Sequence, residues 1–121
     1  MEEGVSSTIL VVDDEPSIRL LCRVNLELEG YRVLEAGTIE EARQLLSANP
    51  VRAILLDVHV GSGDGRELLR EVRETDPGLR VALFTGTADL SPVERASADG
   101  VIPKPFPIDE LVGTVNRLAA R

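Results

Sequence analysis

Short apolar runs alternate with amphipathic stretches five times along the chain. The runs cover residues 9–12, 31–34, 53–56, 81–84 and 101–102. Apart from one arginine in the second run, they contain no polar residue, which is typical of strands buried on both faces. We therefore expect five strands of a parallel sheet with helices on both sides.

Helix signals follow the first run. Pro16 opens a helix at a favoured position, and Gly30 ends it. Leu21, Val24 and Leu28 fall on one side of this helix, and we take that side as its apolar face. The first crossover is therefore expected to be an amphipathic helix.

Capping signals mark the second and third helices. Thr38 with Glu41, and Asp64 with Glu67, have the spacing of a capping box. The inward positions expected on the second, third and last helices are Leu45, Leu46, Leu68, Leu69, Val72, Leu111, Val115 and Leu118.

Two further helices complete the alternation, a weak one over residues 89–98, entered at Ser91-Pro92, and a final one over 108–120. Strict alternation of strands and helices predicts an α/β fold. The right-handed crossover rule leaves few topologies. We expect a flavodoxin-like, doubly wound (βα)5 fold with a five-stranded parallel sheet in the order 2-1-3-4-5.

Composition narrows the class of protein. The 121 residues suit one domain, expected at 8–121 behind a polar N-terminal tail at 1–7. A net charge of −8 argues against direct binding to nucleic acid or to an anionic membrane. The single cysteine, Cys22, excludes an intramolecular disulfide and is expected to be a buried thiol. Neither a run of transmembrane length nor a signal peptide is visible, so we expect a soluble cytoplasmic protein.

Polar residues end the strands at one edge of the predicted sheet. In an open parallel sheet, ligands bind beyond the carboxyl ends of the strands where the winding reverses, here between the first and third strands. The first strand ends at Asp13-Asp14, and the third ends at Asp57. The fourth ends at Thr85, and the fifth delivers Lys104, the one lysine beside twelve arginines.

The chemistry of these groups points to phosphoryl transfer. Three clustered carboxylates repel one another unless a cation offsets their charge. Oxygen ligands suit Mg²⁺, which commonly binds one or two carboxylates together with a phosphate. A carboxylate can also be the nucleophile that accepts a phosphoryl group. Lys104 would then offset charge on the phosphoryl oxygens, and the Thr85 hydroxyl would donate a hydrogen bond to one of them.

Simpler interpretations of the same residues are available. Asp13 and Asp14 could cap the first helix, because acidic residues favour helix N-termini. Asp57 could be a polar loop residue, Thr85 an ordinary hydroxyl at a strand end, and Lys104 a solvated surface lysine. The common edge of all five residues favours a metal and phosphoryl site over these separate explanations.

His59 and the glycines after it have weaker functional signals. No residue at ligand spacing pairs with His59, so we expect an exposed loop side chain that could still affect how water reaches an acyl phosphate. The stretch GSGDG at 61–65 does not match a dinucleotide-binding loop, because Arg66 stands in the place of the third glycine.

Four short motifs stand at the predicted strand ends: VVDDEP at 11–16, LLDV at 55–58, DG at 64–65 and KPF at 104–106. Together with Thr85, their order resembles the receiver domains of two-component response regulators. That family has an acidic pair after the first strand, Asp after the third, Ser or Thr after the fourth and Lys-Pro after the fifth. The resemblance covers nearly the whole chain.

The resemblance implies a role for each matched residue. Asp57 would be phosphorylated, while Lys104 and Thr85 would contact the phosphoryl group. Asp14 would bind Mg²⁺ directly and Asp13 through water. The implied metal ligands are Asp13, Asp14, Asp57 and the backbone carbonyl of His59. The bond between Lys104 and Pro105 would be cis.

By the same resemblance, the chain is a phosphoacceptor switch of a two-component system or phosphorelay. It would be a signalling phosphoprotein that catalyses only its own Mg²⁺-dependent phosphotransfer and autodephosphorylation. A sensor histidine kinase or a histidine phosphotransfer protein would supply the phosphoryl group. A downstream protein, or an output domain of a longer regulator, would respond to the change, and homodimerisation is left open.

Two departures from the family concern the switch. Val101 stands where many receivers have Tyr or Phe three residues before the lysine, and the stretch between Thr85 and Lys104 is shorter than usual. A phosphohydrolase of the haloacid-dehalogenase kind is a second hypothesis, but its D-x-D motif after the first strand is missing because position 15 is Glu. A third is a degenerate receiver that binds partners without phosphorylation, which the complete acidic set argues against.

Overall fold

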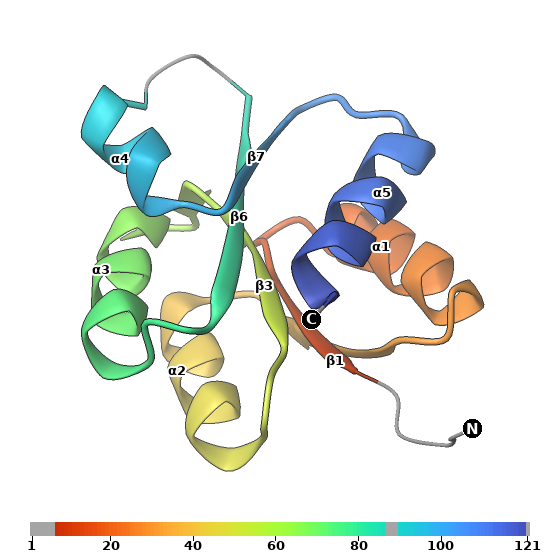
Figure 1. Cartoon of the computed structure of the whole chain (residues 1–121), viewed down its shortest axis with the longest axis horizontal. Helices are drawn as coiled ribbons and strands as arrows, with labels where there is room; N and C mark the ends of the chain where they lie inside the picture. The colour runs from red at the N-terminus through yellow and green to blue at the C-terminus, as the bar shows by residue number, and fades with distance from the viewer. Residues whose placement is uncertain (1–6, 87–89, 121) are drawn as a thin grey trace.

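The computed structural model describes residues 7–86 and 90–120, and its central element is a sheet of five parallel strands (Figure 1). The strands are β1 (Thr8–Val12), β2 (Arg32–Ala36), β3 (Ala53–Asp57), β6 (Arg80–Thr85) and β7 (Gly100–Pro103). Their order in the sheet is β2-β1-β3-β6-β7. Counted along the chain, this is the predicted order 2-1-3-4-5, which is therefore confirmed.

Helices cover both faces of the sheet (Figure 1). On one face lie α1 (Pro16–Leu28) and α5 (Ile108–Ala119). On the other lie α2 (Ile39–Ala48), α3 (Gly65–Thr75) and α4 (Pro92–Ser97). No helix within the described ranges has both the length and the apolar character needed to cross a membrane.

Each strand sends alternate side chains to two separate cores. Ile9 and Val11 belong to the core beneath α1 and α5, whereas Leu10 and Val12 belong to the core beneath α2 and α3. All four side chains are fully buried. This two-sided burial explains why the runs contain almost no polar residue. The inward positions predicted on α3 and α5 are buried, and Leu45 and Leu46 of α2 are partly buried.

The predicted apolar face of α1 is wrong. Leu21, Val24 and Leu28 are 39%, 47% and 79% exposed, whereas Cys22 and Leu26 are fully buried. The helix has apolar residues on two stripes with the same four-residue spacing, one at 18, 22 and 26 and the other at 20, 24 and 28. The first stripe packs on the sheet and the second faces outward.

The predicted capping box of Thr38 with Glu41 is half formed, whereas Asp64 caps its helix without Glu67. Thr38 Oγ1 accepts a hydrogen bond from the backbone N–H of Glu41 at 3.0 Å. The Glu41 carboxylate accepts from the N–H of Gly37 at 2.7 Å, one residue before the cap. Asp64 Oδ1 accepts from the N–H of Arg66 at 2.9 Å. Both caps still satisfy N–H groups that the first turn of a helix leaves unpaired.

Helix α4 is shorter than predicted. It was expected over 89–98 and spans Pro92–Ser97, and position 89 lies outside the described residues. Ser91 and Glu94 form a complete capping box at its start, in which each side chain accepts from the other residue's N–H. None of the six residues of α4 is buried.

A short hairpin between β3 and α3 was not predicted. It pairs β4 (His59–Val60) with β5 (Gly63–Asp64) in antiparallel fashion. Gly61, in the connecting turn, has φ +60, a left-handed conformation that favours glycine. The hairpin fixes the path of the chain from the end of β3 to the start of α3.

The thiol of Cys22 is expected to resist chemical modification in the folded protein. It is fully buried in the core beneath α1 and α5. Burial raises its pKa to about 12, so at mildly alkaline pH far less thiolate is present than for an exposed cysteine. Reaction with Ellman's reagent should be slow in native buffer and fast in denaturant. Rapid reaction without denaturant would contradict the buried placement.

Candidate functional site

Three carboxylates gather at the carboxyl edge of the sheet, between the ends of β1 and β3. Asp13 and Asp14 directly follow β1, and Asp57 is the last residue of β3. One oxygen from each lies within 4.8 Å of the other two. Asp13 is completely buried and Asp57 is half-buried, while Asp14 is exposed. This arrangement could hold a metal ion, since its donors are all hard oxygens.

The ammonium group of Lys104 lies between two of these carboxylates. Its Nζ is 2.6 Å from Asp13 Oδ2 and 3.1 Å from Asp57 Oδ2. Glu15 Oε1 is more distant, at 3.8 Å. The side chain of Lys104 is only 17% exposed, so the interpretation of this residue as a solvated surface lysine is wrong.

The backbone around Lys104 holds it at the sheet edge. Its N–H donates to the carbonyl of Thr85, the last residue of β6, at 2.8 Å. Its ammonium lies 5.6 Å from the ring centroid of Phe84, which stacks on Phe106 with centroids 5.2 Å apart. The bond from Lys104 to Pro105 is cis, as the resemblance implied.

Burial and charge shift the pKa of both Asp57 and Lys104. Loss of solvent raises the pKa of Asp57, and the charge of Asp13 adds to this, although the hydrogen bond from Lys104 opposes it. Burial alone would lower the pKa of Lys104, but hydrogen bonds to Asp13 and Asp57 raise it above its usual value. The lysine therefore stays charged at neutral pH. The ionised form of Asp57 is destabilised by burial, and an added cation nearby would stabilise it.

Thr85 and His59 lie at the same end of the sheet. Thr85 is 8% exposed and ends β6, the strand that pairs with β3. His59 is exposed, as predicted, and its backbone N–H donates to Asp57 Oδ1 at 3.3 Å. The structure thus brings all of the predicted positions, 13, 14, 57, 59, 85 and 104, to one edge.

Gly65 supports the site in a way that the sequence analysis did not recognise. Its N–H donates to the carbonyl of Val58 at 2.7 Å. A Cβ at this position would stand 2.0 Å from the carbonyl oxygen of Asp57. The first turn of α3 can therefore press against the backbone of Asp57 only with glycine there. The DG dipeptide at 64–65 is the signal in the sequence that marks this position.

Replacing Gly65 by alanine should destabilise the fold strongly. The new methyl group would meet a backbone oxygen, which cannot move aside as a flexible side chain can. We expect the free energy of unfolding, measured by urea denaturation, to fall by about 3 kcal/mol. Gly113→Ala is the matched control, because a Cβ there meets no atom within 4 Å. In the middle of α5 that change should stabilise by roughly 0.5–1 kcal/mol. Equal effects of the two substitutions would contradict the close approach at Gly65.

The family model for the response regulator receiver domain matches residues 9–116 of the chain. The chain belongs to the response regulator receiver family. Among solved structures, the receiver is similar to a CheY-like receiver domain protein from Methanospirillum hungatei, with a TM-score of 0.87 and 30% identity over 93% of each chain. It is also similar to the response regulator TrrA from Thermotoga maritima in complex with Mg²⁺ and BeF. There the TM-score is 0.85, the identity is 33%, and the similarity covers 93% of this chain and 98% of that one.

Two relatives of known sequence are longer proteins. The receiver is 36% identical over 118 residues to the response regulator MprA of a Mycobacterium species, which covers 93% of this chain and 50% of that protein. It is 36% identical over 115 residues to the C4-dicarboxylate transport transcriptional regulatory protein DctD of Pseudomonas aeruginosa, covering 90% of this chain and 24% of that protein. The chain thus spans half or less of the length of these relatives.

Proposed function

We propose that this receiver accepts a phosphoryl group on Asp57 in a Mg²⁺-dependent reaction and acts as a switch in a two-component system or phosphorelay. The observation that supports this most is the position of Lys104 Nζ, 2.6 Å from Asp13 and 3.1 Å from Asp57. The ammonium group of Lys104 thus bridges the buried carboxylate of Asp13 and the proposed nucleophile, Asp57. We assign residues 8–121 to the receiver domain and expect the protein to act in the cytoplasm.

The residues at the crevice fit a magnesium ion. The ligands that we propose are the carboxylates of Asp13, Asp14 and Asp57 together with the backbone carbonyl of His59. Three clustered carboxylates with one lysine leave excess negative charge at the site. When bound, Mg²⁺ would neutralise that charge and the charge of the incoming phosphoryl oxygens.

Three residues of the chain would each have one role in the phosphoryl transfer. A carboxylate oxygen of Asp57 attacks the phosphorus, and the bond between phosphorus and the nitrogen of a donor phosphohistidine breaks with its electrons going to the nitrogen. Lys104 offsets negative charge on the phosphoryl oxygens, and the Thr85 hydroxyl donates to one of them. Attack of water on the acyl phosphate later releases inorganic phosphate and restores Asp57.

A sensor histidine kinase or a histidine phosphotransfer protein is the proposed donor. Helix α1 starts two residues after Asp14 and turns Leu20, Leu21 and Val24 outward, with exposures of 53%, 39% and 47%. An exposed apolar surface of this kind marks a contact with another protein. We place the docking of the donor on this face, beside the crevice.

The direct test is mass measurement after incubation with acetyl phosphate. With Mg²⁺ present, we expect the intact mass of the protein to rise by one phosphoryl group and to return on standing as the acyl phosphate hydrolyses. Removal of divalent cations by EDTA should abolish the gain, because the carboxylates would then repel the phosphate dianion. A stable adduct, or an equal gain in EDTA, would argue against the proposal. Multiple turnovers on small phosphate esters would favour a phosphohydrolase instead.

A further inference from the structure

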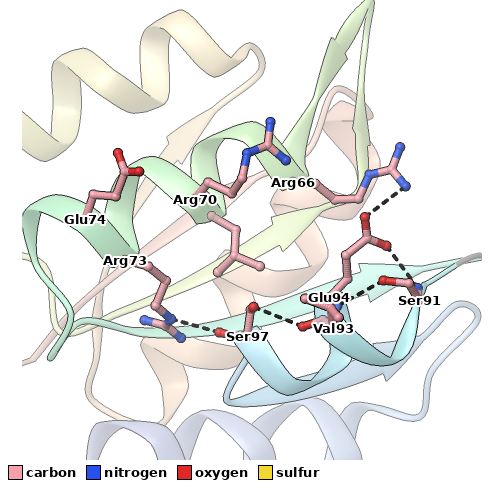
Figure 2. A pocket seen from close by; sticks show the side chains of 9 residues that line it. Arg66, Arg70, Arg73, Glu74, Ser91, Val93, Glu94 and Ser97 are labelled. Atoms are coloured by element: carbon pink, nitrogen blue, oxygen red, sulfur yellow. Dashed lines mark hydrogen bonds and ion pairs between the residues drawn. The ribbon is translucent and has the colours of Figure 1, made fainter.

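A groove runs between helices α3 and α4, away from the carboxylate crevice (Figure 2). It encloses about 410 Å³ and is open to solvent. Leu69 of α3 is one of its lining residues and is itself 2% exposed. Val93 of α4 also lines it and is 75% exposed, the second-largest exposure among the large hydrophobic residues described. The groove therefore exposes apolar surface to a binding partner, mainly that of Val93.

The two helices are tied together at the ends of this groove. Arg66 Nη1 of α3 lies 3.5 Å from Glu94 Oε2 of α4. About two turns further along α3, Arg73 Nε donates to the carbonyl of Ser97 at 2.8 Å. Figure 2 shows these two arginines reaching toward α4, with Arg70 between them on α3. These polar contacts hold α4 against α3, although none of the residues of α4 is buried.

Arg70 differs from its two neighbours. Arg66 pairs with Asp64 at 2.9 Å and with Glu94, and Arg73 pairs with Asp99 at 2.6 Å. Within residues 7–86 and 90–120, Arg70 takes part in neither a hydrogen bond nor an ion pair, and it interacts electrostatically with its chain neighbour Glu71, which is already paired with Arg43. The spacing of 66, 70 and 73 places all three on one side of α3. The central guanidinium is thus available to a carboxylate from outside.

The charged residues that line the groove are three arginines and two glutamates. Two of the arginines are also paired with Asp64 and Asp99, so the lining cation left for an outside group is Arg70. A single guanidinium on an acidic chain of net charge −8 can attract one negatively charged group. One free guanidinium beside an exposed aliphatic side chain fits a peptide better than a polyphosphate, which would need several free cations.

We propose that the groove between α3 and α4 docks a segment of a partner protein that presents a carboxylate to Arg70 and an aliphatic side chain to Val93 and Leu69. Arginine is enriched among the residues that contribute most of the binding energy at protein interfaces. This surface is separate from the proposed donor face on α1. The inference does not depend on phosphorylation of Asp57, and its test is carried out without Mg²⁺ or acetyl phosphate.

The test begins with selection from a phage-displayed library of random peptides against the full chain. We expect the enriched peptides to combine Asp or Glu with Leu, Ile or Val. The synthetic form of an enriched peptide should shift backbone amide resonances of residues 66–74 and 91–97. Its Kd, measured by fluorescence anisotropy, should rise at least about tenfold in Arg70→Glu, since a charge-assisted hydrogen bond would be replaced by repulsion.

Two further variants make the result specific. Val93→Asp should weaken binding in the same way, because it removes apolar contact and adds negative charge. Arg95→Glu is the matched control, because Arg95 is an exposed arginine of α4 that does not line the groove. The Kd of the peptide for this variant should stay within about twofold of the wild-type value. Arg70, Val93 and Arg95 are all exposed, so thermal unfolding should be nearly unchanged in each variant.

Several outcomes would overturn the proposal. These are enrichment of no peptide, enrichment of basic or purely apolar peptides, and amide shifts confined to another surface such as α1. Unchanged binding by Arg70→Glu would do the same. If residues 66–74 and 91–97 shift with protein concentration alone, a second copy of the chain occupies the groove instead.

Discussion

The Asp57→Asn protein, incubated with acetyl phosphate and Mg²⁺, should keep its unmodified mass while wild type gains one phosphoryl group. Asn has nearly the same shape as Asp, but its neutral amide cannot act as the nucleophile that forms an acyl phosphate. Asp13 should not act as nucleophile in its place, because it is fully buried and both of its oxygens are engaged. One accepts a hydrogen bond from Lys104 at 2.6 Å and the other accepts from the N–H of Glu15 at 2.9 Å. The expected effect is therefore all or none.

Asp109→Asn is the matched control for this experiment. Asp109 is exposed in the first turn of α5, so its replacement makes the same chemical change away from the crevice. That variant should be phosphorylated like wild type. A phosphoryl gain on Asp57→Asn would move the acceptor to another residue, and peptide mapping by mass spectrometry would then locate it.

Loss of phosphorylation in Asp57→Asn should not come from unfolding. Burial raises the pKa of Asp57 in the folded state above its ordinary value. A carboxyl group shifted in this direction costs stability above its folded pKa, where it is ionised, and costs none once protonated at low pH. At neutral pH without metal, Asn removes that cost and its Oδ1 can still accept from Lys104. We expect Asp57→Asn to unfold at the same urea concentration as wild type or a higher one.

The order of the sheet could be predicted because it depends on features that are local in sequence. Each buried strand appears as an apolar run, and the handedness of crossovers then restricts the arrangement. The inward face of α1 could not be predicted in the same way. Ile18, Cys22 and Leu26 have the same spacing as Leu20, Val24 and Leu28, so periodicity alone does not say which stripe meets the sheet. Only the packing of α1 against the strands and α5 decides between them.

The positions of the site residues were predictable for the same reason as the sheet. Parallel strands bring their carboxyl ends to one edge, so Asp13, Asp57, Thr85 and Lys104 had to be neighbours once the order was known. The contact between Gly65 and the carbonyl of Asp57 was not predictable, because it depends on how α3 approaches the end of β3. Such an approach is fixed by backbone distances that no residue type reveals on its own.

The groove between α3 and α4 could not be predicted from the sequence either. Arg66, Arg70 and Arg73 look alike in a list of residues, and all could be solvated. Their difference comes from what the fold places opposite each of them, namely Glu94 opposite the first and Ser97 opposite the third. Long-range polar contacts of this kind distinguish a free arginine from one already paired.

Lys104→Met should slow phosphorylation by acetyl phosphate by about a hundredfold to a thousandfold, the loss expected when one aimed charge is removed from the developing charge of a transition state. Met keeps the length and apolar stem of the side chain but removes the ammonium group that lies 2.6 Å from Asp13 and 3.1 Å from Asp57. The rate is measured by intact mass over time at saturating Mg²⁺. Lys104→Arg should retain part of the rate, because it keeps the charge but changes the geometry.

The same variant should lose stability, and the loss should depend on pH. Asp13 is fully buried and would be left without its cation, which costs about 3 kcal/mol of unfolding free energy at neutral pH without metal. The pKa of Lys104 is raised in the fold, so the stabilisation that wild type gains from it is complete below the ordinary lysine value and disappears only as pH rises past the folded value. On the acid side, the difference between the proteins should shrink as Asp57, whose pKa is also raised, becomes protonated. Urea denaturation of both proteins across this range measures the difference. A difference in unfolding free energy that stays constant down to acid pH would mean that Lys104 stabilises the fold by packing rather than by its charge. The ion pairs of Lys104 with Asp13 and Asp57 would then no longer support its proposed role in the transfer.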